Sequence, residues 1–565
     1  NILAGIMMDL RTNGFLSIDN SKKIDSIENN VIVEYNAFVG EFIKRNCLVG
    51  TGLLLTASCR NTIVSQTHDA FCRIALLEES IKKDKCQDCI RVDNKFVADA
   101  MNQVLIRNKC TNTKINYQSS SNIFVLVLLN LAKTIYIALN SWFWPRLFLS
   151  KIKPKGKVLF VDTFLFKNSF DSSGRYQDRY YTRHEAYLTK QEQNRMYFAP
   201  TLYGLKHPWD YISLMKHIKS SDRNFMIKEA WLNLSDYLFS IFYSIIIPLK
   251  IKKYPTYHGI DIEHIVRREV LCDIASPSLF RALCQYRFIR RLSKENVDIC
   301  GVVNWFENSV NDRALNLSFK DYYPKVSIKG YQGFMPIRYY ASLQPQSYEL
   351  KARVLPDVLY VMNEEVMSLY RKTCKDLPLK LSPAFRFSHL FDLQDRRSLV
   401  EKMILISLPG AGMINESVGI IRSYLLIADS LDQNVRVVVK AHPTCTRKQL
   451  IKLASEFSDQ RLEYTDKDIP ELLESAYVMI SAASSVCVEA VAVGIPVALY
   501  GSRSGITMNP IPLSVPSNIW SIFYSEDQLE YFLKEALNKN DRISIVNKLY
   551  APINKENTME LFECV

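Results

Sequence analysis

The sequence contains no internal repeat, no low-complexity tract and no charged-then-apolar leader at its start. Nothing in it therefore indicates a repeat array, and we expect no secretory signal peptide. It also has no recognised nucleic-acid-binding motif, although its formal net charge is +13. That charge favours anionic partners, among them nucleic acid, anionic lipid and nucleotide-linked sugars, without choosing between them.

Metal-binding cysteine patterns are also missing. Thirteen cysteines are scattered singly, apart from the close pair Cys86 and Cys89. A zinc site of the CxxC kind needs a second pair or a histidine partner, and neither accompanies this pair. We therefore expect no metal site and a set of reduced thiols, as in a cytosolic protein.

What is present is the composition of a globular protein, with 48% hydrophobic and 23% charged residues. A chain of 565 residues exceeds one ordinary core, so we expect several domains. In the first hundred residues the runs "NNVIVEYN", "GLLLTAS" and "NTIVSQ" are predicted as strands, and "AFCRIALLEESIKKDK" as an amphipathic helix.

Two apolar segments, 123–155 and 237–254, each end in a basic cluster. The first approaches the length of a spanning helix, but Lys133 near its middle would be costly in hydrocarbon. The second is too short to span and contains Pro248. Aromatic and basic residues gathered in this way favour helices that lie in a membrane interface, with buried core helices as the alternative.

Strand-then-loop units continue along the chain. "KVLFVDTF" predicts a buried parallel strand in which "VLFVD" ends at Asp162, and three more strands follow in "VDICGVVNWFEN", "PKVSIKGYQGF" and "PDVLYVMN". From about Met403 four apolar strands follow, in "KMILISLPGAG", "VRVVVKAHP", "AYVMISAASS" and "GIPVALYGS". This pattern predicts doubly wound α/β domains, whose ligands bind at the carboxyl ends of the strands.

Polar residues follow two of the later strands. One strand ends at Lys440, His442 and Pro443, and another leads into Ser484 and Ser485. Serines at a helix start offer hydroxyl and backbone N–H groups to a phosphate, and a nearby histidine can donate to the same phosphate. Gly410, in "SLPGAG", leaves room for a ligand at the end of a third strand.

The segments "KAHP" and "SAASSVCVEAVAVGIPV" resemble the HP and serine-pair motifs of bacterial GT-B transferases that build surface polysaccharides. These families include bacterial sialyltransferases, polysialyltransferases, capsule Kdo transferases and the polyol-phosphate polymerases of teichoic acid synthesis. The resemblance covers roughly Met403 to Pro512. It implies that His442, Ser484 and Ser485 contact the donor phosphate and that Glu489 holds the nucleotide ribose.

The catalytic carboxylate is expected from the first half of the chain, at a strand end facing the donor. Asp162 is the first candidate, Glu229 and Glu307 are the next, and Glu185 follows. Arginine forks and tyrosine hydroxyls suit an acidic sugar or an acidic acceptor. The segment "GRYQDRYYTRHEAY" therefore offers sugar- or acceptor-binding candidates in Arg175, Arg179 and Tyr180, with an exposed charged helix as the alternative.

The predicted fold is GT-B: two Rossmann-like doubly wound domains that face a cleft. The predicted boundaries are 1–345 for acceptor binding, 346–540 for nucleotide-sugar binding and 541–565 for a C-terminal tail. The predicted enzyme is a metal-independent glycosyltransferase, peripheral on the inner face of a bacterial cytoplasmic membrane. It is expected to use a CMP-linked ulosonic sugar (Kdo, sialic acid or a related nonulosonic acid) as donor, with no cofactor, and a lipid-linked glycan of O-antigen or capsule as acceptor.

Two alternatives stay open. One is a polyol phosphotransferase with a CDP-linked donor, of the teichoic-acid type. Those enzymes commonly carry a second functional histidine motif, and the only other HP in the chain is in "KHPWD". The other alternative is a non-enzymatic basic binding protein, for which the charge is the only support; we expect no nucleic-acid partner.

Overall fold

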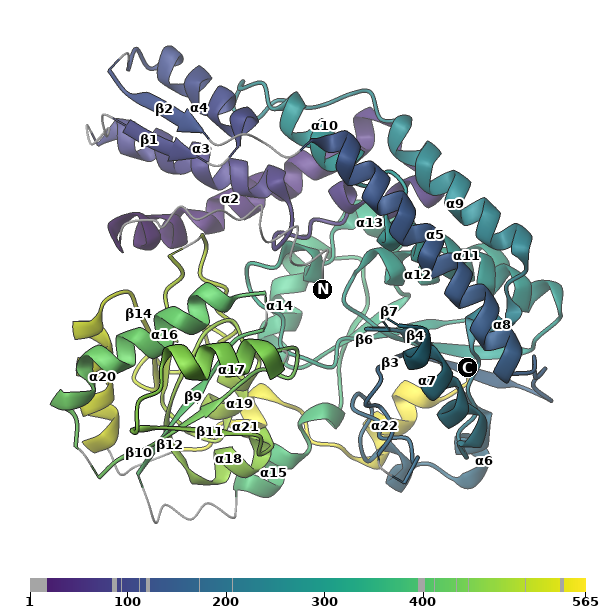
Figure 1. Ribbon diagram of the computed structural model, residues 1–565. Helices are drawn as coiled ribbons and strands as arrows, with labels where there is room; N and C mark the ends of the chain where they lie inside the picture. The colour runs from purple at the N-terminus through teal and green to yellow at the C-terminus, as the bar shows by residue number, and fades with distance from the viewer. Residues whose placement is uncertain are drawn as a thin grey trace.

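A computed structural model describes residues 18–83, 89–92, 94–110, 112–117, 122–171, 173–205, 207–394, 402–410, 412–432, 434–445, 447–503, 505–538 and 543–564. Figure 1 shows two sheet-containing bodies. A further group of helices from the start of the chain lies against the first of them. Cys86, of the close cysteine pair, lies outside the described residues.

The second body is built on a six-stranded parallel sheet in the order β11-β10-β9-β12-β13-β14. Chain order therefore reverses between β9 and β12, as in the Rossmann fold. Its strands are β9 Met403–Ser407, β10 Arg436–Lys440, β11 Leu462–Thr465, β12 Ala476–Ser481, β13 Val497–Tyr500 and β14 Trp520–Phe523. The four strands predicted in this region are confirmed, and β11 and β14 are additional.

Helices cover both faces of this sheet because alternate residues of its strands pack into different cores. Met403 and Leu405 of β9 belong to one hydrophobic cluster, and Ile404 and Ile406 to another. The helices are α16 Ile414–Ile427, α17 Arg447–Glu456, α18 Ile469–Ser475, α19 Val486–Ala492, α20 Glu526–Asn538 and α21 Val546–Leu549.

The first body contains a second six-stranded parallel sheet, in the order β4-β3-β5-β6-β7-β8. Here the reversal lies between β3 and β5, as in flavodoxin-like sheets. Its strands are β3 Val158–Leu165, β4 Met196–Leu202, β5 Ile299–Trp305, β6 Ile328–Tyr331, β7 Val358–Val361 and β8 Leu379–Leu381. Two doubly wound domains in one chain are the GT-B architecture, so the predicted fold class is confirmed.

The predicted boundary between residues 345 and 346 is wrong because it falls between β6 and β7, which pair in one sheet. The first domain therefore continues through β8, a connecting segment with η5 (Phe385–Phe387) and α15 (His389–Gln394) follows, and the second domain begins near β9. The final helix, α22 (Lys555–Phe562), returns to the first domain, where Lys329 donates to the carbonyl of Glu560.

One cysteine expectation also changes at this return. Cys300 of β5 and Cys564, just beyond α22, form a disulfide, so the prediction of reduced thiols is wrong for these two residues. The disulfide joins the end of the chain to the centre of the first sheet.

The helices of the first body and its N-terminal part are α2 Ile18–Arg45, α3 Gln66–Lys82, α4 Lys95–Arg107, α5 Ile123–Phe148, α6 Lys190–Arg195, α7 Pro208–Ser220, α8 Lys228–Trp231, α9 Leu234–Leu249, α10 Glu263–Leu271, α11 Pro277–Lys294, α12 Val310–Tyr322, α13 Ser347–Lys351 and α14 Glu364–Thr373. Short 3₁₀ turns are η1 Gly50–Leu54, η2 Thr56–Ser58, η3 His184–Tyr187, η4 Ala341–Leu343, η5 Phe385–Phe387 and η6 Ala428–Ser430. A two-stranded parallel pair, β1 Cys89–Val92 and β2 Lys114–Tyr117, lies among the first helices.

The three strands predicted in the first hundred residues are wrong. "NNVIVEYN" lies inside α2, whose buried residues Val31, Tyr35, Phe38 and Phe42 recur every three or four positions, as on one helix face. "GLLLTAS" forms the 3₁₀ turns η1 and η2, and "NTIVSQ" runs through turns into the start of α3. The predicted amphipathic helix is confirmed as α3.

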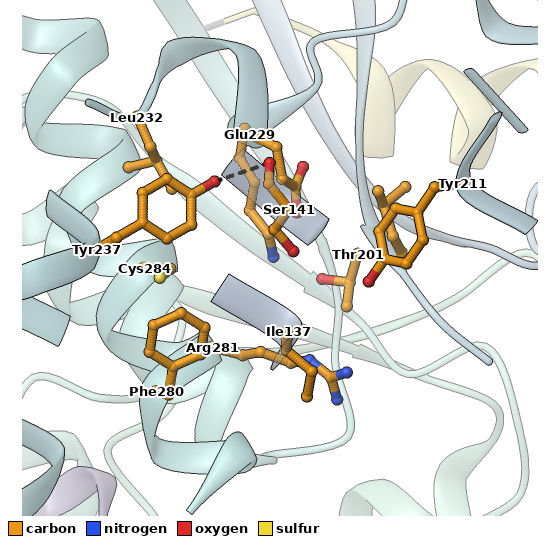
Figure 2. A pocket seen from close by; sticks show the side chains of 12 residues that line it. Ile137, Ser141, Thr201, Tyr211, Glu229, Leu232, Tyr237, Phe280, Arg281 and Cys284 are labelled. Atoms are coloured by element: carbon orange, nitrogen blue, oxygen red, sulfur yellow. Dashed lines mark hydrogen bonds between the residues drawn. The ribbon is translucent and has the colours of Figure 1, made fainter. Parts of the chain in front are cut away.

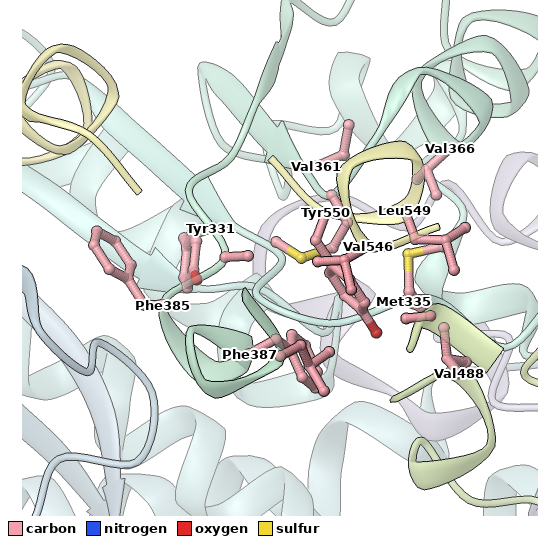
Figure 3. Packing of buried hydrophobic residues seen from close by; sticks show 14 of the residues in the cluster. Tyr331, Met335, Val361, Val366, Phe385, Phe387, Val488, Val546, Leu549 and Tyr550 are labelled. Carbon is pink, nitrogen blue, oxygen red and sulfur yellow. The ribbon is translucent and has the colours of Figure 1, made fainter. Parts of the chain in front are cut away.

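One hydrophobic cluster joins the two domains. Figure 3 shows Phe387 from the connecting segment, Val488 from α19 and Tyr550 from the end of α21 packed with Met335 of the first domain. Because these residues come from both bodies and from the segments that link them, the two domains share an apolar core at their junction.

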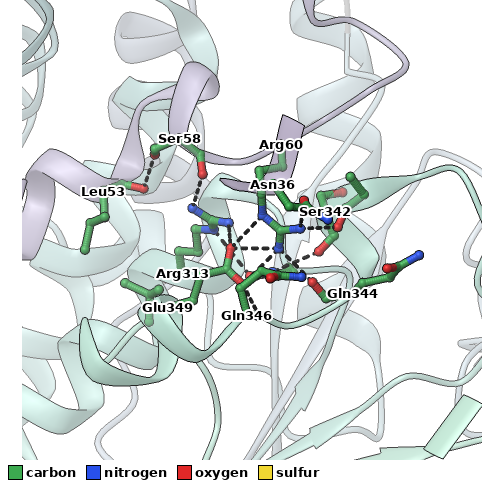
Figure 4. Close-up of polar contacts among 12 residues, drawn as sticks. Asn36, Leu53, Ser58, Arg60, Arg313, Ser342, Gln344, Gln346 and Glu349 are labelled. Atoms are coloured by element: carbon green, nitrogen blue, oxygen red, sulfur yellow. Dashed lines mark hydrogen bonds and ion pairs between the residues drawn. The ribbon is translucent and has the colours of Figure 1, made fainter. Parts of the chain in front are cut away.

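A buried polar network fixes the N-terminal helices to the first domain (Figure 4). The Glu349 carboxylate accepts hydrogen bonds from the guanidinium groups of Arg60, at 2.9 Å, and Arg313. Its Oε2 also accepts from the side-chain amide of Asn308 at 3.2 Å and from the backbone N–H of Gln346 at 2.9 Å. Two cations and two neutral donors share one carboxylate, so the charge of Glu349 is well compensated although it is fully buried.

Candidate functional site

The switch point of the second sheet lies between β9 and β12, and the predicted phosphate-binding loops follow these strands. The Ser481 hydroxyl at the end of β12 donates to the carbonyl of Ser407 at the end of β9, at 2.6 Å. Gly410 follows β9, and Ser484 and Ser485 follow β12. The fold therefore brings these three residues to the place where doubly wound sheets bind ligands.

His442 follows β10, the strand beside β9, and its ring is oriented by Thr444. The backbone N–H of Thr444 donates to Nδ1 of His442 at 3.1 Å, and the Thr444 hydroxyl lies 2.8 Å from the same nitrogen. Because Nδ1 accepts, the proton of the neutral ring is on Nε2. Burial, with a contribution from the Arg386 charge, lowers the pKa of His442, so the ring is neutral at pH 7 and Nε2–H is a donor.

The loop after β9 lies against this histidine. A Cβ atom placed on Gly410 would be 3.9 Å from Nδ1 of His442 and 3.5 Å from the hydroxyl oxygen of Thr444. These are ordinary van der Waals distances, so a small side chain would also fit at this position. Gly410 and His442, which were predicted separately, thus border the same space.

The hydroxyl groups of Ser484 and Ser485 can form further hydrogen bonds, for example with a ligand. Ser485 is the N-cap residue of α19, yet its side chain makes no capping hydrogen bond. The Ser484 hydroxyl accepts only a long contact of 3.4 Å from the N–H of Val486. Ala483, just before them, has a φ of +38°, a strained value for a residue with a side chain. The turn after β12 is therefore held in an unusual conformation.

Other predicted donor-site residues are engaged elsewhere. Glu489 is buried in α19, and its Oε2 lies 3.2 Å from Nε2 of His389. The Lys440 ammonium donates to the carbonyl of Asp466 at 2.9 Å, and Pro443 is exposed. In this structure Glu489 meets a histidine of the connecting segment, which sequence reasoning did not single out.

In the first sheet the switch point lies between β3 and β5, and Asp162 and Glu307 flank it. Asp162 does not end its strand as predicted: β3 continues to Leu165, and the Asp162 side chain is 2% exposed. Burial, followed by repulsion from Asp312, raises its pKa, and Lys228 opposes the rise. Asp162 thus lies beneath the edge of the sheet.

Glu307 lies two residues past the end of β5 and is partly exposed. The indole N–H of Trp305 donates to its Oε1 at 2.9 Å. Tyr180 packs edge-on against Trp305, with the ring centres 4.4 Å apart. Burial raises the pKa of Glu307, which suits a general base that must work near neutral pH.

Asp312 holds the Glu307 loop in place. Its Oδ2 accepts the backbone N–H groups of Glu307 and Ser309, at 2.9 and 3.0 Å, as part of a capping box at the start of α12. Burial, with repulsion from Glu307, raises the pKa of Asp312 to about 7. The ionisation of Asp312 therefore depends on the charge of Glu307.

Glu229 faces a different space from Glu307. It lines a cavity of about 20 Å³ with Thr201, Tyr237 and Arg281 (Figure 2). This volume is enough for a single water molecule. Its Oε2 is buried without a hydrogen-bond partner among the described residues, and burial raises its pKa. The cavity is too small for a sugar, so Glu229 is a weaker candidate for the base than Glu307.

Arg386 is the residue that sequence reasoning missed. It is exposed on η5, in the segment that connects the domains. Its charge opposes the burial-driven rise in the pKa of Glu307 and adds to the burial-driven fall in the pKa of His442. Arg386 therefore acts electrostatically on a carboxylate of one domain and on a histidine of the other.

The remaining predicted residues are spread over the first domain. Arg175 pairs with Asp171 at 3.6 Å, Arg179 donates to the carbonyl of Asn168, and Glu185 pairs with Arg223. Tyr180 alone of the predicted acceptor residues lies beside Glu307, whose charge is among the causes that raise its pKa after burial. Turns and the short η3, and not a long helix, occupy this segment.

The second HP of the chain is a helix cap. Pro208 is the first residue of α7, and the backbone N–H of His207 donates to the Asp210 carboxylate at 3.1 Å. Among the residues that the structure describes, no three His, Cys, Asp or Glu side chains gather as the ligands of a metal would.

Comparisons with known proteins concern the fold only. No family model matches the chain, and neither does any curated protein. Among solved structures, UDP-GlcNAc 2-epimerase from Neisseria meningitidis bound to UDP-GlcNAc is 12% identical, with a TM-score of 0.41 over 72% of this chain and 98% of that one. The S. aureus MnaA–UDP co-structure is 12% identical, with a TM-score of 0.40 over 73% and 95%. WaaG, a glycosyltransferase involved in lipopolysaccharide biosynthesis, is 11% identical, with a TM-score of 0.33 over 72% and 96%.

Proposed function

We propose that this protein is a glycosyltransferase that takes an acidic ulosonic sugar from a CMP-linked donor. The observation that carries the proposal is the placement of Glu307 just past β5 and of His442 just past β10, one in each doubly wound domain, with the charge of Arg386 acting on both. A base on one side and phosphate-binding donors on the other are the groups that sugar transfer requires.

In the proposed reaction the donor phosphate binds beside Nε2–H of His442, with the hydroxyls of Ser484 and Ser485 as further donors. Glu307 accepts the proton of an acceptor hydroxyl, whose oxygen forms the new bond to the anomeric carbon. The bond from that carbon to the phosphate oxygen breaks, and the electron pair leaves with CMP. Arg386 and His442 stabilise the resulting negative charge, so no metal or cofactor is required.

The positive charge of Arg386 suits an acidic sugar. The guanidinium of Arg386 matches a carboxylate in a two-pronged geometry, and Tyr180 offers a hydroxyl on the same side as Glu307. A sugar of the Kdo or sialic acid kind carries such a carboxylate. The acceptor that we propose is a lipid-linked glycan of O-antigen or capsule, at the inner face of a bacterial cytoplasmic membrane.

A second candidate is transfer of a polyol phosphate from a CDP-linked donor. Enzymes of that type commonly use two histidines, and His389 is a second histidine, paired with Glu489 and carried by the same connecting segment as Arg386. The position of His389 therefore supports polyol-phosphate transfer, although the donor domain contains no second HP motif.

The experiment is a nucleotide-release assay with CMP-linked acidic sugars, CDP-glycerol and UDP-GlcNAc, each with and without a membrane extract as acceptor. Release of CMP that depends on the extract is expected from the wild-type protein and not from Glu307→Gln. Release of the nucleotide from CDP-glycerol, or turnover of UDP-GlcNAc and of no other donor, would contradict the acidic-sugar proposal.

A further inference from the structure

Helix α5 has its polar and apolar sides reversed relative to a helix of a water-soluble protein. Its buried residues are small or polar: Asn130, Thr134, Ala138, Asn140, Ser141 and Pro145. Its exposed residues include nine large hydrophobic side chains: Phe124, Val125, Leu128, Leu129, Ile135, Tyr136, Leu139, Phe143 and Leu147. The buried positions recur at the spacing of one helix face, so the apolar face is turned away from the protein.

Helix α9 repeats the reversal. Asp236, Ser240 and Ser244 are buried, four residues apart, on the side that faces the protein. The Asp236 carboxylate accepts from Nε of both Arg287 and Arg291, each at 2.7 Å. Its exposed large hydrophobic residues are Leu234, Leu238, Phe242 and Leu249.

The two helices run antiparallel and form one surface. The Tyr237 hydroxyl in the first half of α9 donates to the carbonyl of Ser141 in the second half of α5, at 3.1 Å. At the other end, Thr134 donates to the carbonyl of Ala275, whose N–H donates to the carbonyl of Ser244. Figure 1 shows α5 and α9 side by side along the outside of the first domain. We call their exposed hydrophobic residues the α5–α9 face.

The α5–α9 face is far more apolar than the surface of an ordinary soluble protein, where exposed leucines are scattered singly. Soluble proteins rarely expose a contiguous apolar patch of more than a few hundred Å². Leu139 is 62% exposed and Phe242 is 58% exposed, and both lie amid other hydrophobic side chains on the same helices. A polar inner side and an apolar outer side together indicate that the outer side contacts an apolar medium. The predicted alternative of two buried core helices is therefore wrong.

Positive charge flanks the face at both ends. Lys153 and Lys155 follow α5 at one end, and Lys250, Lys252 and Lys253 follow α9 at the other, because the helices are antiparallel. All five lysines are exposed. Such lysines attract the anionic headgroups of a bilayer whose acyl layer would receive the hydrophobic side chains.

Helix α5 is tied to the globular domain along most of its length. By length and composition it is the one helix among the described residues that could cross a membrane. However, Asn130 donates to the carbonyl of Cys272, Thr134 to that of Ala275, and Arg146 to that of Leu232. A spanning orientation would draw these carbonyls and their polar surroundings into hydrocarbon, which is costly. A helix tied in this way suits an orientation parallel to a membrane surface better than one that crosses it.

We propose that the α5–α9 face docks flat into the interface of a bilayer that contains anionic phospholipid. This binding is independent of the sugar chemistry proposed above, because it requires no nucleotide and no residue of the interdomain site. The occupant is a lipid surface, chosen over a second protein copy because the basic residues at both ends complement anionic headgroups.

The test is co-sedimentation of the full chain with phosphatidylcholine vesicles, with and without phosphatidylglycerol. Wild-type protein is expected to bind only the anionic vesicles and to be released by alkaline carbonate, as an in-plane helix would be. The variant Leu139→Gln/Phe242→Gln and the variant Lys250→Glu/Lys253→Glu should each bind at least about tenfold more weakly. Leu426→Gln, at an exposed leucine of α16 in the other domain, is the matched control and should bind like the wild type.

These substitutions are at exposed positions, so the variants should unfold at the wild-type temperature. Failure of the wild type to bind anionic vesicles, or equal binding by the variants, would overturn the proposal. A concentration-dependent dimer that Leu139→Gln/Phe242→Gln abolishes would instead assign the face to a second copy of the chain. Resistance to carbonate would contradict the in-plane orientation.

Discussion

The backbone N–H of Thr444 donates to Nδ1 of His442 at 3.1 Å, and this contact fixes which nitrogen of the imidazole carries the proton. With Nδ1 as acceptor, the neutral ring presents Nε2–H to a ligand. Burial and the Arg386 charge disfavour the imidazolium, so this donor is available without protonation.

The tautomer gives a direct spectroscopic prediction. In ¹⁵N-histidine-labelled protein, the signals absent from His442→Gln should show the Nε2–H pattern at pH 7. Since the pKa of His442 is lowered, its midpoint should lie below the ordinary value of about 6.5. An Nδ1–H pattern, or a midpoint above that value, would contradict the geometry.

Glu307→Gln should abolish transfer while leaving nucleotide binding within about twofold of wild type, because the amide keeps the side-chain shape but cannot accept a proton. A loss of at least roughly 100-fold in kcat is expected for removal of a general base. Glu185→Gln is the matched control, since Glu185 pairs with Arg223 away from the junction. Equal losses in both variants would show that Glu307 is not the base.

Arg386→Gln should lower kcat more than it raises KM, because in the proposed reaction its charge stabilises the leaving phosphate. A loss of about 10- to 100-fold is expected for one charge-assisted hydrogen bond of ~1.5–3 kcal/mol. Arg386→Lys should recover part of the loss, and Arg267→Gln, at an exposed helix pair, should behave as wild type. Arg386→Gln with unchanged kcat would remove Arg386 from the mechanism.

Asp312 predicts a pH dependence of stability. Its folded-state pKa of about 7 lies above its unfolded value, so between pH 4 and 7 the folded state holds a proton that the unfolded state releases. Its contribution is therefore fully present below the unfolded pKa and is lost as pH rises through the folded pKa. Between those values the slope approaches ~1.4 kcal/mol per pH unit.

Urea unfolding at pH 5 and pH 7 gives the free energy of unfolding of the wild type and of Asp312→Asn. The difference between their pH dependences measures the contribution of Asp312. The free energy of unfolding of the wild type should fall more steeply with pH than that of the variant, whose amide does not titrate. Parallel pH profiles would show that the Asp312 carboxyl has an ordinary pKa in the folded protein.

Much of the fold was predictable because buried parallel strands appear as short apolar runs between loops and helices. That signal located β9, β10, β12 and β13. It failed in α2, where the run around Val31 and Val33 has a strand-like composition but belongs to a long helix whose buried positions have helical spacing. Strand composition also does not tell which sheet a strand joins, so β7 and β8 were assigned to the wrong domain.

The positions of the candidate residues at strand ends were predictable where they follow apolar runs directly, as His442, Ser484 and Glu307 do; their roles stay predictions. No sequence pattern indicated Arg386, because it lies on a short 3₁₀ turn whose position depends on the hydrophobic packing at the junction of the two domains. Asp162 was expected at the end of its strand but is buried within it, because the strand extends three residues beyond the run "VLFVD". Both errors concern tertiary placement, which local sequence patterns do not determine.

The proposed CMP-binding site is built around His442. Calorimetric titration with CMP, CDP, UDP and GDP measures its selectivity on wild type and on His442→Ala, with His207→Ala as the control because His207 is a helix cap. We expect CMP to bind most tightly and His442→Ala to weaken that binding by about tenfold or more, as loss of one donor to a phosphate should. A folded protein that binds none of these nucleotides, or binds them equally well without His442, would contradict it.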